Sequence, residues 1–307
     1  MCKNFKNTKF GVEIEFTGIT REKAAAAMAG VLGTTYHYTG GAYNAWTCVT
    51  GDGIARPRTW KIVSDGSISL VDSRGASTYN REYSCEFVSP ILTYEDMATL
   101  QNILRAFRKA GAKVNHSCGI HIHLDGAPQT LQSIKNWAAL VASRNDLFYK
   151  ALKVDAYRLT YCKKNDEALV QNLKNAKDLT DAFAAWYKTY PDYRRGTSEH
   201  YHGSRYHFLN LHSFFSGSNG TVEIRGFNST MHAGELRSYV ALALALNEQA
   251  LTQKCARAAK PQTENEKFAM RTYLNRIGLI GSEFETCREV LTRNLSGCSA
   301  WRFGTPR

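Results

Sequence analysis

Several short stretches of the sequence alternate between apolar residues and charged or imidazole residues. Because successive side chains of a β-strand point to opposite faces, such a stretch predicts a strand with one apolar face and one polar face. The alternating stretches are GVEIEF (11–16), CGIHIHL (118–124) and TVEIRG (221–226). Their apolar faces predict a packed core, and their polar faces carry glutamates, histidines and an arginine.

Other acidic residues lie within or just after predicted strands. Glu86 lies among apolar residues in YSCEFVSPIL, before Pro90, and Asp65 lies in a turn after the strand of KIVSDGSI. The whole segment 34–92 is rich in Tyr, Thr, Trp, Gly and Val and contains turn pairs, which predicts several antiparallel strands. A polar hairpin, SGSNG, is expected to join two later strands at 205–215 and 220–227.

Apolar residues at helical spacing predict the helices, and a Gly or Pro marks where several of them end. The expected helices cover 20–32 with Thr20 as N-cap, 94–110 stopped by Gly111, 129–153, 165–189 before Pro191, and most of the chain from Glu235 onward. Residues 192–204 are polar and basic and predict a mobile loop that serves as a lid. We therefore expect an α+β fold built on a largely antiparallel sheet.

The chain has 307 residues, no evident linker and no internal repeat, which predicts one domain over 1–307. Its motifs occupy about 10–250, with a helical insertion at about 129–200 and a C-terminal helical segment at about 251–307. The formal net charge of +12 favours polyanionic partners, although no run of basic residues points to nucleic acid. Eight scattered cysteines without a CxxC pair, no signal peptide and no membrane span predict a soluble, cytoplasmic protein with reduced thiols.

The polar faces of the alternating strands carry the candidate chemistry. A single glutamate on such a strand is an ordinary solvated charge, but glutamate is depleted in strands and recurs here. If the faces converge, two carboxylates 4 Å apart repel by about 4 kcal/mol at an effective dielectric near 20. Mg²⁺ or Mn²⁺ supplies the missing countercharge, whereas zinc prefers more His and Cys. Arg225 suits a phosphate oxygen, so the set favours phosphoryl transfer without a P-loop, a kinase signature or a GxGxxG turn.

The ordered set of motifs resembles the amidoligase family, which belongs to the glutamine synthetase and glutamate–cysteine ligase superfamily. The motifs are GVEIEF, WKIVSDGSI, EFVSPIL, CGIHIHL and RYHFLNLHSFFSGSNGTVEIRGFNSTM. The resemblance covers most of 10–250 and implies an antiparallel half-barrel sheet with helices on its outer face. It also implies ATP and two or three Mg²⁺ or Mn²⁺ ions. A substrate carboxylate then attacks the γ-phosphate, and an amine converts the acyl phosphate into an amide or isopeptide bond.

The resemblance also implies roles for individual residues. It assigns the metal ions to Glu13, Glu15, Glu86, His121 and Glu223. It assigns the amine side to Asp65 and the transferring phosphoryl group to Arg225, with His121 contacting metal or phosphate. The residues implied to face the nucleotide or substrate are Arg205, Asn210, Arg225 and His123, and His123 departs from the polar residue that relatives often carry there.

Three other functions are compatible with the same residues. A phosphotransferase acting on a guanidinium group would use the same metal and nucleotide site. A metal-dependent hydrolase or nuclease would use the carboxylates without ATP, and a binding protein would keep the fold alone. The residues do not identify the acid, which ranges from an amino acid to a cell-wall peptide or a protein side chain, although the positive charge favours an acidic polymer. They leave the amine and the oligomeric state open as well.

Overall fold

A computed structural model describes residues 5–51, 57–217, 220–260 and 264–300. Its strands are β1 Phe10–Phe16, β2 Tyr36–Gly40, β3 Ala45–Thr50, β4 Arg58–Val63, β5 Cys85–Val88, β6 Gly119–Asp125, β7 Leu209–Asn210 and β8 Thr221–Asn228. In the described residues they form an eight-stranded sheet in the order β2-β3-β4-β5-β1-β6-β8-β7. The strand pairs β1–β5, β2–β3, β3–β4, β4–β5 and β7–β8 are antiparallel. The mixed fold with an antiparallel sheet is therefore confirmed.

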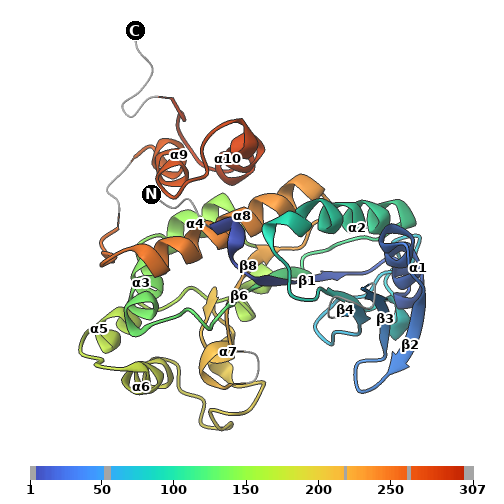
Figure 1. Cartoon of the computed structure of the whole chain (residues 1–307), viewed down its shortest axis with the longest axis horizontal. Coiled ribbons are helices and arrows are strands. Elements are labelled where there is room, and N and C mark those ends of the chain that lie inside the picture. Colours follow the sequence, from blue (N-terminus) through green and yellow to red (C-terminus); the bar gives the residue numbers. More distant parts are fainter. Residues whose placement is uncertain (1–4, 52–56, 218–219, 261–263, 301–307) are drawn as a thin grey trace. The chain divides into compact units, whose positions relative to one another are not determined.

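The principal helices fall between and after these strands (Figure 1). They are α1 Arg21–Leu32, α2 Met97–Ala110, α3 Leu131–Ala142, α4 Asn145–Ala151, α5 Ala168–Lys174, α6 Leu179–Thr189, α7 His212–Phe215, α8 Ala233–Thr252, α9 Glu266–Arg276 and α10 Glu285–Thr292. No helix in the described residues is long and apolar enough to cross a membrane. The seven cysteines there are free thiols, and Cys2 lies outside the described residues.

The chain forms two compact units. The strand-rich unit comprises Lys9–Ile122 and Phe227–Arg237, and the helix-rich unit comprises Met1–Thr8, His123–Gly226 and Ser238–Arg307. Each unit has its own buried aromatic residues. The single domain expected from the sequence stays a prediction.

The strand-rich unit buries the apolar side of its alternating strands. Phe16 of β1 stacks on Phe107 of α2 at a ring distance of 5.0 Å, and Phe107 contacts Phe87 of β5 at 5.8 Å. Helix α1 packs on β2, β3 and β4, where the Cys48 thiol lies 3.7 Å from the Ala25 carbonyl oxygen. The core therefore occupies one face of these strands, and the residues that alternate with it point to the other face.

Both predicted helices of the strand-rich unit begin or end where the sequence signals indicated. The Thr20 hydroxyl accepts a hydrogen bond from the Lys23 amide at 3.3 Å and caps α1. Gly111 adopts φ 100° after α2, a left-handed conformation that a residue with a Cβ rarely takes.

Each of the two long helices predicted for 129–153 and 165–189 is instead two shorter helices in the helix-rich unit. Helix α3 stops at Ala142 because Arg144 leaves the helical region at φ −131°. Helix α6 starts anew at Asp178, whose carboxylate accepts from the Asp181 amide at 2.9 Å. The apolar periodicity continued across both breaks, so it could not locate them. The predicted helix end before Pro191 is confirmed, since α6 ends at Thr189.

The strand predicted at 205–215 is wrong in its length. Only Leu209 and Asn210 form β7, and the chain then turns into α7 because the Asn210 side-chain oxygen accepts from the His212 amide at 2.8 Å. Its antiparallel partner is β8, as expected, with Asn210 opposite Glu223. Ser218 and Asn219 of the predicted SGSNG hairpin lie outside the described residues.

Candidate functional site

A pair of carboxylates faces one another across two strands of the strand-rich unit. Antiparallel register places Glu15 of β1 directly opposite Glu86 of β5, and Glu13 opposite Val88. Glu15 is 5% exposed, and Glu13 and Glu86 are half-buried. Like charges at directly opposed positions destabilise a sheet. This pair therefore favours a cation at this point.

Asp65 joins this pair from the end of β4. Val63, the last residue of β4, lies opposite Glu86, and the chain then turns so that carboxylate oxygens of Glu15, Asp65 and Glu86 lie within 4.8 Å of one another. One Asp65 oxygen, Oδ1, accepts from the Ser67 amide at 2.6 Å and from the Ser67 hydroxyl. Asp65 is thus held in the orientation that the cluster requires.

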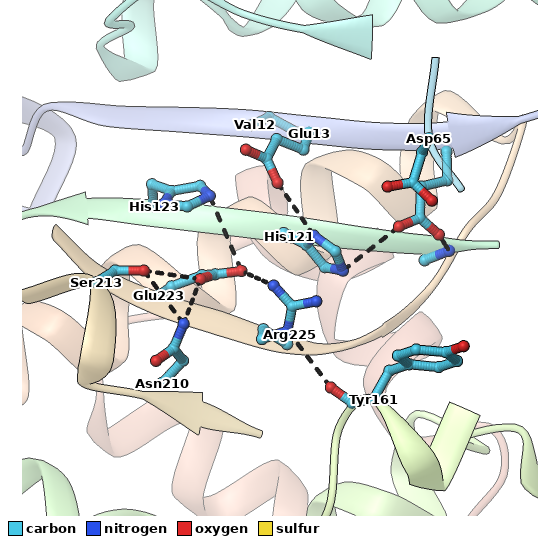
Figure 2. A network of polar contacts seen from close by, with 12 residues as sticks. Val12, Glu13, Asp65, His121, His123, Tyr161, Asn210, Ser213, Glu223 and Arg225 are labelled. Carbon is cyan, nitrogen blue, oxygen red and sulfur yellow. Dashed lines mark hydrogen bonds and ion pairs between the residues drawn. The ribbon is translucent and has the colours of Figure 1, made fainter. Parts of the chain in front are cut away.

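His121 of β6 supplies the imidazole of the same cluster. Its Nδ1 lies 3.1 Å from Glu13 Oε2 and its Nε2 lies 3.8 Å from Glu15 Oε1 (Figure 2). Donor atoms of Glu13, Glu86 and His121 lie within 4.8 Å of one another, so Glu86 belongs to two groups of ligands. The Gly119 amide donates to Glu15 Oε2 at 2.5 Å and fixes the second oxygen of that carboxylate.

This donor set fits Mg²⁺ or Mn²⁺. Four carboxylates and one imidazole provide the oxygen-rich, hard environment that these ions prefer, and no cysteine is among the five donors. The cation would also offset the repulsion between Glu15 and Glu86. Four of the five metal ligands implied by the resemblance, Glu13, Glu15, Glu86 and His121, therefore meet here together with Asp65, and their function as ligands stays a prediction.

Two residues that the sequence analysis did not identify hold Asp65 in place. Ser84 is fully buried, and its hydroxyl both donates to the Asp65 carbonyl at 2.6 Å and accepts from the Asp65 amide at 2.9 Å. The buried guanidinium of Arg21, at the start of α1, donates to the Ser84 carbonyl at 2.9 Å and to the Arg81 carbonyl at 2.5 Å. The position of Ser84, two residues before Glu86 in the same predicted strand, was a weak indication of its role, whereas nothing in the sequence around Arg21 indicated one.

A second polar cluster surrounds Glu223 in the helix-rich unit. Glu223 is 1% exposed, and its Oε2 accepts from Asn210 at 2.6 Å and from the Ser213 hydroxyl at 3.0 Å. Its Oε1 forms an ion pair with Arg225 and lies 3.9 Å from His123 Nε2 (Figure 2). Four of the predicted residues therefore lie together here: His123, Asn210, Glu223 and Arg225.

Contacts from neighbouring segments fix the orientation of Arg225 and His123. The Arg225 Nε donates to the Tyr161 carbonyl at 3.4 Å, and His123 Nδ1 lies 3.0 Å from the Thr221 hydroxyl. Gly226 follows Arg225 at a point where a Cβ would lie 2.0 Å from Cδ2 of Phe208. Only glycine fits there without moving the Phe208 ring.

Arg205 makes its described contacts away from this cluster. Its guanidinium donates to the His200 carbonyl at 3.0 Å and lies 5.5 Å from the Tyr201 ring centre and 5.8 Å from that of Tyr206. These contacts belong to the basic loop at 192–204 and its flank. A nucleotide-binding role for Arg205 stays a prediction from the resemblance.

Comparison with known proteins identifies the family. A family model described as "Putative amidoligase enzyme" matches residues 6–247. The chain belongs to this amidoligase family. The resemblance inferred from its motifs is thereby confirmed, and the family indicates an enzyme of the ligase class.

Other comparisons are more distant. No curated protein matches this amidoligase. Among solved structures it is similar to a bifunctional glutathione synthetase from Pasteurella multocida, at 13% identity and a TM-score of 0.40. The alignment covers 94% of this chain and 47% of that one, so the amidoligase spans about half the length of that structure.

The basic loop of the amidoligase is held by its own carboxylates. Asp192 accepts from the Gly203 amide at 2.8 Å and from the Arg194 amide at 2.9 Å, and these backbone donors lower the pKa of its carboxyl. The Gly196 amide donates to Glu199 at 2.7 Å. The segment therefore consists of defined turns, and its predicted use as a lid stays a prediction.

Proposed function

We propose that this amidoligase is an ATP-dependent carboxylate–amine ligase that forms an amide or isopeptide bond through an acyl phosphate. The observation that carries the proposal is the Glu15–Glu86 pair, extended by Glu13, Asp65 and His121 into two groups of metal donors. Such a concentration of carboxylates is costly without cations, and phosphoryl transfer from ATP depends on divalent cations. Membership of the amidoligase family supports the choice of a ligase.

The residues of the cluster divide into two candidate metal sites that share Glu86. Glu13, Glu86 and His121 would hold one ion, and Glu15, Asp65 and Glu86 would hold another. The ions would neutralise the phosphate oxygens and leave the phosphorus open to the substrate carboxylate. We infer a half-barrel of the glutamine synthetase type for the sheet, on the strength of the family and the antiparallel pairing.

The cluster around Glu223 supplies the groups proposed for phosphate and nucleotide. Arg225 would stabilise the charge on the transferring phosphoryl group, and its ion pair with Glu223 orients the guanidinium. Glu223 would serve as a further metal ligand in addition to this pair. Asn210, His123 and Arg205 are the proposed nucleotide- or substrate-facing residues.

Asp65 is the residue proposed for the amine side. Its Oδ1 is occupied by Ser67, and no described residue donates a hydrogen bond to Oδ2. Oδ2 would therefore either bind the second ion or face the amine, where it would accept a proton from the attacking amine or hold the ammonium before it loses one. A plot of rate against pH for Asp65→Asn distinguishes a proton acceptor from an ammonium ligand.

The test is a screen for phosphate release from Mg²⁺-ATP across pooled acids and amines, with products identified by mass spectrometry. We expect release only when both an acid and an amine are present. Glu13→Gln and Glu223→Gln should abolish turnover and remain folded by circular dichroism. Their matched controls, Glu22→Gln at an exposed position of α1 and Glu248→Gln at a half-buried position of α8, should retain turnover. Turnover at the wild-type rate in both site variants would contradict the site assignment.

The same screen separates the alternative functions. A guanidinium phosphotransferase would yield ADP and a phosphorylated acceptor without free phosphate. A hydrolase or nuclease would cleave its substrate with Mg²⁺ in the absence of ATP. Either result would contradict the proposed ligase activity but would remain compatible with metal binding by the same carboxylates.

A further inference from the structure

One row of side chains crosses the polar face of the strand-rich unit from β1 to β2. Glu13 lies opposite Val88, Val88 opposite Lys61, Lys61 opposite Thr47 and Thr47 opposite His37. Directly paired residues project from the same face of a sheet. The row therefore changes in character from carboxylate, through an apolar residue, to ammonium, hydroxyl and imidazole.

The exposure of β4 confirms which face this row occupies. Trp60 and Ile62 are 1% and 0% exposed and belong to the core under α1, whereas Lys61 between them is exposed. Lys61 therefore shares the face of Glu13, Glu15 and Glu86, not the face covered by the helix.

Lys61 is a cation with no protein partner close to an acidic cluster. Its backbone pairs with β3 and β5, but its ammonium forms no hydrogen bond or ion pair with any residue in the described parts of the chain. Because Val88 lies opposite Lys61, Glu86 is its diagonal neighbour, at a spacing of roughly 7–8 Å between backbones. Long side chains can span that distance, yet the structure records no ion pair between Lys61 and Glu86, and Lys61 is exposed to solvent beside the carboxylates, where a ligand can reach it.

The surface between Lys61 and the carboxylates suits the carbon chain of a small acid. Val63 and Val88, both half-buried, form an apolar floor there. The hydroxyls of Thr47 and Thr59 flank Lys61 on the same face and can donate to a carboxylate. A ligand lying on this surface would meet metal ions at one end and an ammonium with two hydroxyls at the other.

We propose that Lys61 binds a second carboxylate of the acid substrate, so that the acid joined by this enzyme is a dicarboxylate. This rests on the ligase function proposed above. The reacting carboxylate would lie beside Glu86 and the other residues that would hold the ions, and the other carboxylate would lie at Lys61. Acidic amino acids and peptides with a free acidic residue and terminus belong to this class.

The first test measures binding without turnover. Glutarate and its half-amide, glutaramate, differ only in whether the second end carries a charge, and succinate and succinamate form a shorter pair. By calorimetry in Mg²⁺, wild type should bind a dicarboxylate at least about tenfold more tightly than its half-amide, as expected for a hydrogen bond to a charged group. Lys61→Ala should remove that preference, and Lys61→Arg should restore part of it. Lys23→Ala, which removes a charge from α1, should leave it unchanged.

The result that overturns the inference is equal binding of dicarboxylates and half-amides by wild type, including binding too weak to detect for both. Equal preference in wild type and Lys61→Ala overturns it too. So does an equal loss in Lys23→Ala, which would reveal a general charge effect.

The second test uses turnover and separates this inference from the proposed function. Lys61→Ala should raise the KM for the acid about tenfold and leave the KM for ATP unchanged. A rise in the KM for ATP alone would mean that Lys61 binds a nucleotide phosphate, and the substrate assignment would fail. Lys61-dependent dicarboxylate binding without any ATP turnover would uphold the site and reject the ligase. Ligase turnover with unchanged kinetics in Lys61→Ala would do the opposite.

Discussion

Two alternating strands of this amidoligase carry glutamates on a polar face, and their charges are balanced in opposite ways. In the strand-rich unit Glu15 faces Glu86, a residue of the same charge on the neighbouring strand. In the helix-rich unit Glu223 pairs with Arg225, two residues later on its own strand, and accepts from Asn210 and Ser213. In the first cluster four carboxylates meet one imidazole, and we call it unbalanced; in the second the carboxylate lies beside a guanidinium, and we call it balanced.

The pattern of residues along one strand therefore does not determine the electrostatics of its polar face. GVEIEF and TVEIRG both form strands with one polar face. The net charge of each face depends on a further residue: Glu86 on the strand opposite Glu15, and Arg225 two positions after Glu223 on the same strand. An unbalanced cluster is suited to bind metal ions, whereas a balanced one is suited to hold a guanidinium in a fixed orientation.

The largest effect on stability is expected from breaking the balanced pair. Arg225→Leu leaves the buried Glu223 carboxylate without its cation and should lower the free energy of unfolding by about 3–5 kcal/mol. The double variant Glu223→Leu/Arg225→Leu should lose less than the sum of the single losses. Urea denaturation measures both, with exposed Arg74→Leu as the control. Additive losses would show that the pair is not coupled.

A smaller effect is expected from filling the unbalanced cluster. Mn²⁺ at a hundred times its dissociation constant should stabilise wild type by about 2.7 kcal/mol, because it binds only the folded form. Glu86→Gln should abolish this gain, since Glu86 belongs to both groups of donors. Glu22→Gln should keep it. Thermal unfolding with and without Mn²⁺ gives the comparison, and an undiminished gain in Glu86→Gln would exclude this cluster as the metal site.

The helix-rich unit, which contains the balanced cluster, also buries two histidines in their neutral form. Burial lowers the pKa of His207 and of His212 to about 4, against 6.5 in the unfolded chain. Between these values the unfolded state binds more protons, so stability falls as the pH is lowered from 6.5 towards 4. Each histidine should cost about 2 kcal/mol at pH 5 relative to pH 7. Denaturation at both pH values should show a smaller loss in His212→Gln, and an unchanged loss would contradict this account.

The smallest effect distinguishes the clusters by its sign. With divalent metal removed by a chelator, Glu86→Gln should stabilise the protein by up to about 1 kcal/mol, because it removes the like charge opposite Glu15. Glu223→Gln should destabilise under the same conditions, since Arg225 then loses its carboxylate. Parallel urea titrations measure both variants. Destabilisation by both would mean that the contrast between the clusters is wrong.

Local patterns were sufficient to predict the strands and the residues they present. GVEIEF, CGIHIHL and TVEIRG form strands, and the two compact clusters contain nine of the residues expected at the site. Alternation determines the face of a residue, and the face determines which residues are able to meet. Helix breaks at 143–144 and 175–178 were missed because apolar periodicity continued through the non-helical backbone of Arg144 and through the capping contact of Asp178.

The sequence could not predict the roles of residues whose contacts lie far away along the chain. Arg21 reaches the 81–84 turn across sixty positions, and only the fold reveals that its guanidinium meets two carbonyls there. The same holds for Lys61, whose significance depends on the register of three strands rather than on its neighbours in sequence. Arg205 shows the converse, since a position suggested by resemblance lies among the tyrosines of its own loop.

Because one face of β4 is buried in the core and the other is not, residues on its two faces differ in how freely they can be substituted during evolution. Substitutions at Lys61 and Thr59 alter the surface beside the acidic cluster, while Trp60 and Ile62, which belong to the core, keep their packing. Selection for a different ligand at this surface can therefore act on alternate positions of β4 with little loss of stability. A library randomised at Lys61 and Thr59 would test ligand preference almost independently of stability.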